Sequence, residues 1–299
     1  MFLQNSILKK LLPYLSVFLL TLFWGYNWVV MKQAVQYIGP WEFGFIRNFF
    51  GAICLFVVIF LLKKRISIKH YWDVFLIGVF QMIGFTVLVL VALVTGLASK
   101  TSVLTFTMPI WALLMAHLIL KEKIFKFQWI ALIVSFVGLM FILNPLHRQA
   151  DFISMLIATS AGFFWACGVI AVKKYHQKYP EVDLLLLTAW QMLLGSLPIL
   201  AVIFFKGITI YSVSNYLIGA SIYNAVFCNA LAWILWLYGV KHLPAGTVSL
   251  LSLMAPVIGS IASFIQLNEV PHVNEQVGMF LIVASIIFLI IAGIRTRAK

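Results

Sequence analysis

Arg47 is the residue of this sequence whose placement costs the most free energy, because its charged side chain lies in an apolar run that begins at Trp41. On a helix it would stand ~9 Å from Trp41 along the axis, and insertion scales assign an arginine near the centre of a membrane-spanning helix a cost of ~2.5–3.5 kcal/mol. A bound carboxylate or other anion would offset this cost, since a guanidinium offers two parallel donors. The alternative is structural: the side chain extends to the surface or satisfies carbonyls at a helix end.

Amide and indole side chains form a second pattern. Asn27 has Trp24 and Trp28 within one helical turn, and Asn229 is followed at i+4 and i+7 by Trp233 and Trp236. Residues at such spacings share a helix face. A face that combines an amide with aromatic rings suits an amphipathic organic molecule. The same pattern also occurs where helices pack together or meet the membrane interface.

Carboxylates are missing from the middle of every apolar run. All eight acidic residues fall at the ends of these runs or in loops: Glu42, Asp73, Glu122, Asp151, Glu181, Asp183, Glu269 and Glu275. A proton-coupled cation exporter usually needs a buried carboxylate, so this class is disfavoured. The sequence also lacks a buried aspartate pair, a glycine-framed serine and a zinc motif. We therefore expect no catalytic residue, no metal and no cofactor, and the three isolated cysteines predict no disulfide framework.

The composition identifies the environment in which these residues are placed. Of the 299 residues, 64% are hydrophobic and only 10% are charged, and the mean hydropathy is +1.07. The apolar runs have lengths near the ~20 residues that cross a ~30 Å hydrocarbon core. A net charge of +13 suggests nucleic-acid binding, but the basic residues lie in short loops between apolar runs, as in membrane proteins. We therefore expect the lipid bilayer, and not nucleic acid, as the partner.

The fold class is predicted to be all-α, a polytopic membrane protein, because lipid offers backbone groups no partners outside a helix or a closed barrel. The first apolar run lacks a small-residue cleavage site and is expected to be a retained span. We predict ten transmembrane helices, at residues 12–35, 41–62, 71–94, 98–120, 125–143, 151–172, 183–205, 213–238, 244–267 and 273–294.

The basic residues then predict the orientation. With the N-terminus in the cytoplasm, 16 of the 21 lysines and arginines lie on the cytoplasmic side, and Lys32, Lys100, Arg148 and Lys206 lie outside. This bias follows the positive-inside rule and places both termini in the cytoplasm. Lys32 and Lys100 are expected near the outer ends of their helices, with their side chains extended to the surface.

The chain contains an internal repeat. A shift of 147 superposes residues 98–122 on residues 245–269, with a matched proline in the middle, Pro109 on Pro256, and a matched glutamate at the end. Each proline removes a backbone donor and leaves a carbonyl to be satisfied near mid-membrane. We predict helix breaks at both prolines that border a cavity; an ordinary kink packed against a neighbouring helix is the alternative.

Earlier segments repeat at slightly smaller shifts, which loop insertions explain. Trp24 corresponds to Trp165 at a shift of 141, and Arg47 corresponds to Gln191 at a shift of 144. We therefore divide the chain into a first five-helix repeat at 1–147 and a second at 148–299. Because five crossings are an odd number, the second repeat enters the membrane from the opposite side. Inverted repeats of this kind are typical of transporters with a midplane site.

These segments carry a family resemblance. The run LFWGYNWVVMKQAV at 22–35, followed by Pro40 and by FIRNF at 45–49, together with the doubled proline segments, resembles the EamA-type transporters of the drug/metabolite transporter superfamily. The resemblance covers essentially the whole chain. It implies ten helices as two inverted five-helix repeats, and inner-membrane transport, commonly export, of amino acids or related small metabolites. The second repeat has Trp165, Ala166 and Gly168 where the first has Trp24, Gly25 and Asn27, so the two sides of a cavity would differ chemically.

We predict alternating access about a central site between the two halves. Its substrate-binding residues are expected to be polar or aromatic side chains from both repeats: Trp24, Asn27, Trp28, Arg47, Gln81, Phe85, Thr105, Trp165, Gln191, Asn224, Asn229 and Trp233. The fifth and tenth spans carry few polar groups and the small residues Gly138 and Gly278, and are expected to be packing helices that could form a homodimer contact. Within transporters, nucleoside-like compounds and organic acids are alternatives to amino acids; outside them, an intramembrane enzyme or a membrane scaffold is the alternative.

Overall fold

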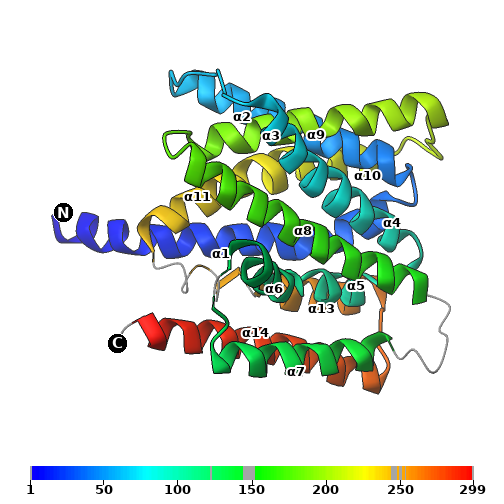
Figure 1. The fold of residues 1–299 in the computed structure, drawn as a ribbon. Helices are drawn as coiled ribbons and strands as arrows, with labels where there is room; N and C mark the ends of the chain where they lie inside the picture. The colour runs from blue at the N-terminus through cyan, green and yellow to red at the C-terminus, as the bar shows by residue number, and fades with distance from the viewer. Residues whose placement is uncertain are drawn as a thin grey trace.

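The computed structural model describes residues 2–121, 123–143, 152–243, 248, 251–252 and 254–297, and this part of the chain is all-helical (Figure 1). The first part of the chain forms α1 (Phe2–Ala34), α2 (Pro40–Leu61), α3 (Tyr71–Gly78), η1 (Val79–Val87), α4 (Leu88–Thr95), α5 (Ala98–Thr105), α6 (Met108–Leu120) and α7 (Lys126–Leu143). The second part forms α8 (Phe152–Lys178), α9 (Leu184–Lys206), α10 (Asn215–Ile222), η2 (Tyr223–Leu231), α11 (Ala232–His242), α13 (Met254–Leu267) and α14 (Val273–Arg297).

Seven of these helical segments are long and apolar enough to cross a membrane: Leu11–Ala34, Pro40–Leu61, Tyr71–Thr95, Ala98–Leu120, Phe152–Lys178, Leu184–Lys206 and Asn215–His242. Three shorter apolar helices accompany them, at Lys126–Ile142, Met254–Leu267 and Val273–Phe288. The protein is therefore a multi-pass helical membrane protein, as expected from its composition. The helix ends lie close to the predicted ranges, although the start of the predicted span 244–267 includes residues outside the described part.

Local sequence signals account for several helix starts. Pro40 occupies the first turn of α2, where its missing N–H is not needed. The Asp183 side chain accepts hydrogen bonds from the N–H groups of Leu185 and Leu186 at the start of α9. The Ser214 side chain accepts from the N–H of Leu217 at the start of α10.

Two helical segments have π geometry that the sequence analysis did not predict. η1 continues α3 into α4, and η2 continues α10 into α11. A shift of 144, the same shift that pairs Arg47 with Gln191, superposes the bounds of η1 on those of η2. Short π-helical stretches are rare and occur frequently at functional sites.

The helix at 98–120 breaks where the sequence predicted, immediately before Pro109. α5 ends at Thr105 and α6 begins at Met108. The carbonyl of Thr105 faces α8 at Gly162, where an added Cβ would lie 2.8 Å from it. Pro256 is buried in the first turn of α13, and the positions before it at 249, 250 and 253 lie outside the described residues.

Helices from the two parts of the chain interleave. α1 packs most extensively against α13, α8 packs against α5 and α6, and α2 packs along α9. α7 and α14 form a separate layer below these helices in the view of Figure 1. Within it an added Cβ on Gly138 would lie 2.8 Å from the carbonyl of Gly278, so the two helices pack against each other within the chain.

Lys100 corrects one prediction. Its side chain does not extend to the surface; Nζ lies 2.7 Å from Oε1 of Glu275, and the two side chains are only 5% and 0% exposed. Lys32 Nζ donates to the carbonyl of Leu93 (2.8 Å), near the end of α4. The apolar pattern of the sequence did not reveal this buried counter-charge, because Glu275 on α14 is distant from Lys100 along the chain.

Glu269 is the matched glutamate at the end of the second copy of the repeated segment; its position there, shared with Glu122, predicts a contact with a loop or a helix end, and Glu269 makes such a contact. Its carboxylate accepts from the N–H groups of Ala98 (2.9 Å) and Ser99 (3.1 Å), at the start of α5. A carboxylate is favoured there because the first N–H groups of a helix have no partners within the helix. The corresponding contact expected for Glu122 lies outside the described residues.

Candidate functional site

A cavity of about 390 Å³ lies between the two parts of the chain. Its walls come from α1, α2, η1 and α5 of the first part and from α8, α9, η2 and α11 of the second. This volume is within the range of small-molecule sites. Both parts of the chain are needed to form the walls, so the cavity exists only in the folded molecule.

Eleven of the twelve side chains predicted to form a site line this cavity: Trp24, Asn27, Trp28, Arg47, Gln81, Phe85, Thr105, Trp165, Gln191, Asn229 and Trp233. Asn224 is not among the lining residues. Asn224 is buried, and its Nδ2 donates to the carbonyl of Ala220 (3.1 Å). Ala220 belongs to an apolar cluster that also contains Leu217. Neither Pro109 nor Pro256 lines the cavity, although Thr105 and Met108 beside the first break do.

Arg47 is held in the cavity wall by contacts across the two parts of the chain. Its Nη2 donates to Oδ1 of Asn229 (3.2 Å) and its Nη1 to Sδ of Met31 (2.8 Å). Asn229 in turn donates from Nδ2 to the carbonyl of Arg47 (2.7 Å) and to Oδ1 of Asn48 (3.2 Å). Arg47 as a whole residue is 7% exposed, so the alternative in which its side chain extends to the surface is excluded.

Gln191, the repeat counterpart of Arg47, has a different partner. Its Nε2 donates to Oε1 of Gln81 on η1 (2.8 Å). Gly168 on α8 makes room for this pair, because an added Cβ there would lie 2.5 Å from Cγ of Gln81. A shift of 141 pairs Gly168 with Asn27. Glycine at 168, where the first part of the chain has asparagine, therefore leaves space for the Gln81 side chain.

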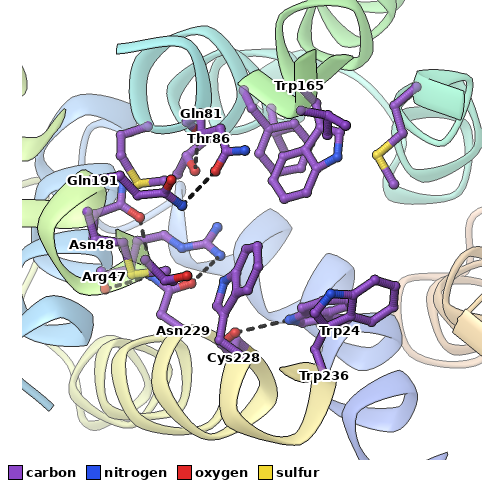
Figure 2. A pocket seen from close by; sticks show the side chains of 18 of the residues that line it. Trp24, Arg47, Asn48, Gln81, Thr86, Trp165, Gln191, Cys228, Asn229 and Trp236 are labelled. Atoms are coloured by element: carbon purple, nitrogen blue, oxygen red, sulfur yellow. Dashed lines mark hydrogen bonds between the residues drawn. The ribbon is translucent and has the colours of Figure 1, made fainter. Parts of the chain in front are cut away.

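Aromatic rings form the other side of the cavity (Figure 2). The Trp233 ring lies 6.0 Å from that of Trp24 and 6.1 Å from that of Trp165, and Phe85 stands 4.5 Å from Trp165, all measured between ring centroids. Nε1 of Trp24 donates to the carbonyl of Cys228 (3.0 Å), which fixes the orientation of its ring. Arg47, Gln81, Gln191 and their amide neighbours gather opposite these rings in the close-up.

Several polar atoms of the wall have no protein partner although they are buried. They are Asn27 Oδ1, Arg47 Nε, Asn48 Nδ2 and Gln191 Oε1. Unpartnered buried polar atoms are costly and need an explanation. No Asp, Glu, Lys or His is among the described residues that line the cavity, so Arg47 is its single charged group.

The sequence analysis missed lining residues of two kinds. Asn48 is adjacent to Arg47 in the FIRNF motif, and an amide in an apolar run was a signal that could have identified it. Met31, Thr86 and Cys228 also line the cavity, but residues of these types are common in the packed interior of membrane helices and gave no signal.

The cavity reaches one end of the helix bundle. Its lining includes Leu184, the first residue of α9, and Val240, near the end of α11. Towards the opposite end, where α1 gives way to α2, buried apolar side chains pack together, among them Ile38, Phe43 and Leu93. An antiparallel bridge between Ile38 and Ile210 joins two loops at that end.

Comparison with known proteins identifies the family to which this chain belongs. The model of the EamA-like transporter family matches the chain twice, over residues 11–144 and 152–291. The chain therefore belongs to the EamA-like transporter family and is a membrane transporter. A protein of known crystal structure shares the fold, with a TM-score of 0.63, 13% sequence identity and coverage of 93% of this chain and 96% of that one.

Relatives in several organisms match most of this chain over most of their own length. The uncharacterized transporter YoaV of Bacillus subtilis is 25% identical over 278 residues, which cover 91% of this chain and 94% of YoaV. An uncharacterized transporter of Archaeoglobus fulgidus is 26% identical and covers 90% of this chain and 95% of its own. The S-adenosylmethionine uptake transporter of Rickettsia bellii is 25% identical over 274 residues, which cover 91% of each protein.

Proposed function

We propose that this transporter carries small organic metabolites, amino acids or related compounds, across the bacterial inner membrane by alternating access. Ten helices would form two inverted five-helix repeats, at 1–147 and 148–299, with both termini in the cytoplasm. The observation that carries the proposal is the cavity between the two parts of the chain, whose wall combines one guanidinium and several amides with an array of indole rings.

Several features support the two-repeat organisation. The family model matches each part of the chain separately, and the two π segments have the same register within their repeats. The packing is reciprocal as well: α1 of the first part packs on α13 of the second, and α8 of the second packs on α5 and α6 of the first. Such exchange of equivalent contacts is expected when two halves are related by a pseudo-two-fold axis.

The unequal ends of the cavity support alternating access. It extends to the start of α9 and the end of α11 and is closed by apolar packing at the other end. With a cytoplasmic N-terminus, the accessible end is the cytoplasmic one. The structure then represents an inward-facing state that can load substrate from the cytoplasm, as export requires. Rocking of the two halves would open the end at Ile38 and close the end at Leu184.

A second candidate substrate class comes from one relative. The Rickettsia bellii protein is named for uptake of S-adenosylmethionine, a compound that combines an amino acid with a nucleoside. The indole rings of Trp24, Trp165 and Trp233 offer stacking surfaces for an adenine base. Flux measurements on this protein should therefore include nucleoside-like substrates and should be made in the uptake direction as well.

Enzymatic and scaffold functions fit the site less well. General acid–base catalysis needs a titratable group within reach of a substrate, and no His, Asp, Glu or Lys is among the described lining residues. The thiol of Cys228, which also lines the cavity, has no His or carboxylate beside it in that lining to act as its base, and its Sγ donates to the carbonyl of Phe23 (3.5 Å). A scaffold would not need a cavity. The lipid bilayer and a small molecule are thus the partners that we propose, without nucleic acid, and a homodimer through α7 and α14 would be compatible with the position of this layer.

Flux measurements in proteoliposomes test the proposed function. Purified protein would be reconstituted in both orientations and supplied with a panel of labelled amino acids, nucleosides and organic acids. We expect saturable flux of at least one amino acid, and a reduction of about tenfold or more in Asn27→Ala, because Asn27 contributes an unpartnered acceptor to the cavity wall.

The matched control is Asn274→Ala, which removes the same side chain from an exposed position in α14. It should retain the flux of the unmodified protein. Absence of flux for the whole panel, or full flux in both Asn27→Ala and Arg47→Gln while these variants remain folded, would contradict the proposal.

A further inference from the structure

The charge of the cavity wall identifies a substrate class more narrowly than the fold does. Arg47 is buried, and no carboxylate lies among the described residues that line the cavity with it. Its Nη1 donates to the thioether of Met31, which is a weak acceptor, and its Nε has no partner. A buried guanidinium that lacks a counter-ion is costly, so the wall as built favours a ligand with a negative charge.

The neighbouring amides are arranged to leave a second donor free. Asn229 donates to Oδ1 of Asn48, so the oxygen of Asn48 is used within the wall. Nδ2 of Asn48, a buried donor, remains without a partner. Arg47 Nε and Asn48 Nδ2 therefore both lack acceptors at the same end of the cavity. A carboxylate supplies two oxygen acceptors and matches the planar fork of a guanidinium.

The number of cations limits the charge of the ligand. Arg47 is the single cation among the described lining residues. A phosphate monoester, with a charge of about −1.5 to −2 near neutral pH, would enter the cavity with uncompensated charge. A monocarboxylate would leave the occupied cavity neutral.

The remainder of the wall defines the rest of the ligand. Figure 2 shows the polar group around Arg47 on one side and the indoles of Trp24, Trp165 and Trp236 on the other, with open space between them. Flat aromatic rings with fixed orientation favour an aromatic or flat apolar body. The carboxylate and the body of the ligand would then occupy opposite sides of the cavity.

We infer that the cavity selects monocarboxylates with an aromatic body, whose carboxylate binds to Arg47 and Asn48. This inference rests on the proposed transport site and names its substrate class. An amino group is not required for it, because the charge that is missing from the wall is negative. Cationic amines of the same size should be rejected, since they would place a second positive charge beside Arg47.

Equilibrium binding to purified protein, measured by isothermal titration calorimetry, tests this inference with three probes of similar shape. They are 3-phenylpropionate, its neutral amide 3-phenylpropionamide, and the cation phenethylamine. We expect the carboxylate to bind about tenfold or more tightly than either of the other two, as a charge-assisted hydrogen bond to a buried arginine predicts. Failure of 3-phenylpropionate to bind, or equal binding of the acid and the amide, would overturn the inference without any variant.

Variants then test whether Arg47 causes the preference for the acid. In Arg47→Gln the ratio between the affinities for the acid and for the amide should fall to about one, because residues 47 and 191 are then both neutral glutamines. The double variant Arg47→Gln/Gln191→Arg returns a guanidinium to the opposite wall and should restore part of the preference. Arg65→Gln removes an arginine from the exposed loop after α2 and should bind as the unmodified protein does. A preference that persists in folded Arg47→Gln would show that another group binds the anion.

The binding assay does not depend on transport, so the two proposals can fail separately. Selective binding of the acid through Arg47 without flux in proteoliposomes would contradict the transport mechanism and leave the ligand class intact. Flux together with equal binding of acid and amide would contradict the ligand class alone.

Discussion

Arg47 and Gln191 occupy equivalent positions of the two repeats and have different partners. Arg47 pairs with Asn229 on η2, and Gln191 pairs with Gln81 on η1. Each contact joins the second helix of one part to the π segment of the other part. The two contacts therefore have the same arrangement, while Arg47 places the single charge of the described cavity lining on one side only.

The polar residues of the site could largely be predicted from the sequence, because a polar side chain in an apolar run is costly and needs a reason. Asn224 shows the limit of that argument. It satisfies its donor within its own helix, beside the apolar cluster that closes one end of the bundle. Residue type alone does not distinguish a buried amide that bonds to its own backbone from one that lines a cavity.

Asp183 allows a prediction about pH dependence outside the membrane-spanning segments. Burial raises the pKa of its carboxyl, whereas the ion pair with Lys64 and the N–H groups of Leu185 and Leu186 lower it by more, so the pKa lies below its ordinary value. A lowered pKa stabilises the folded state above the ordinary value of ~3.9, and this contribution is lost as the pH falls through the folded-state pKa.

We predict that Asp183→Asn reduces stability by less than about 1 kcal/mol at pH 7, because the ion pair is about 40% exposed and asparagine also caps helices. The difference from the unmodified protein should be smaller at pH 3 than at pH 7, because the carboxyl is partly protonated below its ordinary pKa. Thermal unfolding in detergent at both pH values measures this. An equal difference at pH 3 and pH 7 would show that the carboxylate charge is not responsible.

At the level of elements, the two π segments are the main feature that the sequence did not indicate. The long apolar runs predicted continuous helices through residues 79–87 and 223–231, and the chain is indeed helical there. Gln81 and Phe85 of η1 and Asn229 of η2 line the cavity, and the π segments also pack against other helices. Gly84, for example, lies against Phe164 of α8, where an added Cβ would be 2.6 Å from the ring.

The ion pair between Lys100 and Glu275 connects α5 to α14 and leads to an element-level prediction. Lys100→Met should destabilise the protein by about 3–5 kcal/mol, because it leaves Glu275 buried without its lysine. Glu275 also accepts from the N–H of His272 (2.8 Å), so its carboxylate is held in place. Chemical or thermal unfolding in detergent measures the loss.

The double variant Lys100→Met/Glu275→Leu separates charge from packing. It should recover most of the lost stability, since replacing both partners of a buried ion pair by apolar residues is often neutral or stabilising. If the double variant is as unstable as the single one, the two elements are joined by packing and not by the ion pair.

For the whole molecule, the interleaved packing explains why neither part of the chain forms the cavity by itself. α2 lies along α9, and the pairs of α1 with α13 and of α8 with α5 cross between the parts. No residue of α7 or α14 is among the described residues that line the cavity. In the proposed transport cycle the walls would move by rearrangement between the two parts of the chain.

The proposed inversion of the two parts of the chain predicts that their equivalent loops lie on opposite sides of the membrane. The exposed residues Ser67, between α2 and α3, and Ser212, between α9 and α10, occupy such loops. In a protein without its three native cysteines, Ser212→Cys should react with a membrane-impermeant maleimide in intact cells. Ser67→Cys should react only in inside-out vesicles, because its loop follows the positive-inside rule.

The labelling experiment needs a control for accessibility. Both variants should react fully after solubilisation in detergent, which shows that each thiol can be reached. Reaction of both from the same side of the intact membrane would contradict the inverted arrangement.

The sequence by itself determined the helical membrane class, the approximate ends of the helices and the polar residues that needed compensation. These follow from local composition, because a bilayer admits only hydrogen-bonded backbone and charges a free-energy cost for each buried polar group. The tertiary structure alone decided which residues became partners: Arg47 with Asn229, Gln81 with Gln191, and Lys100 with Glu275. These pairs are separated by 110 residues or more along the chain, so they depend on how helices from the two parts pack, which local patterns do not encode.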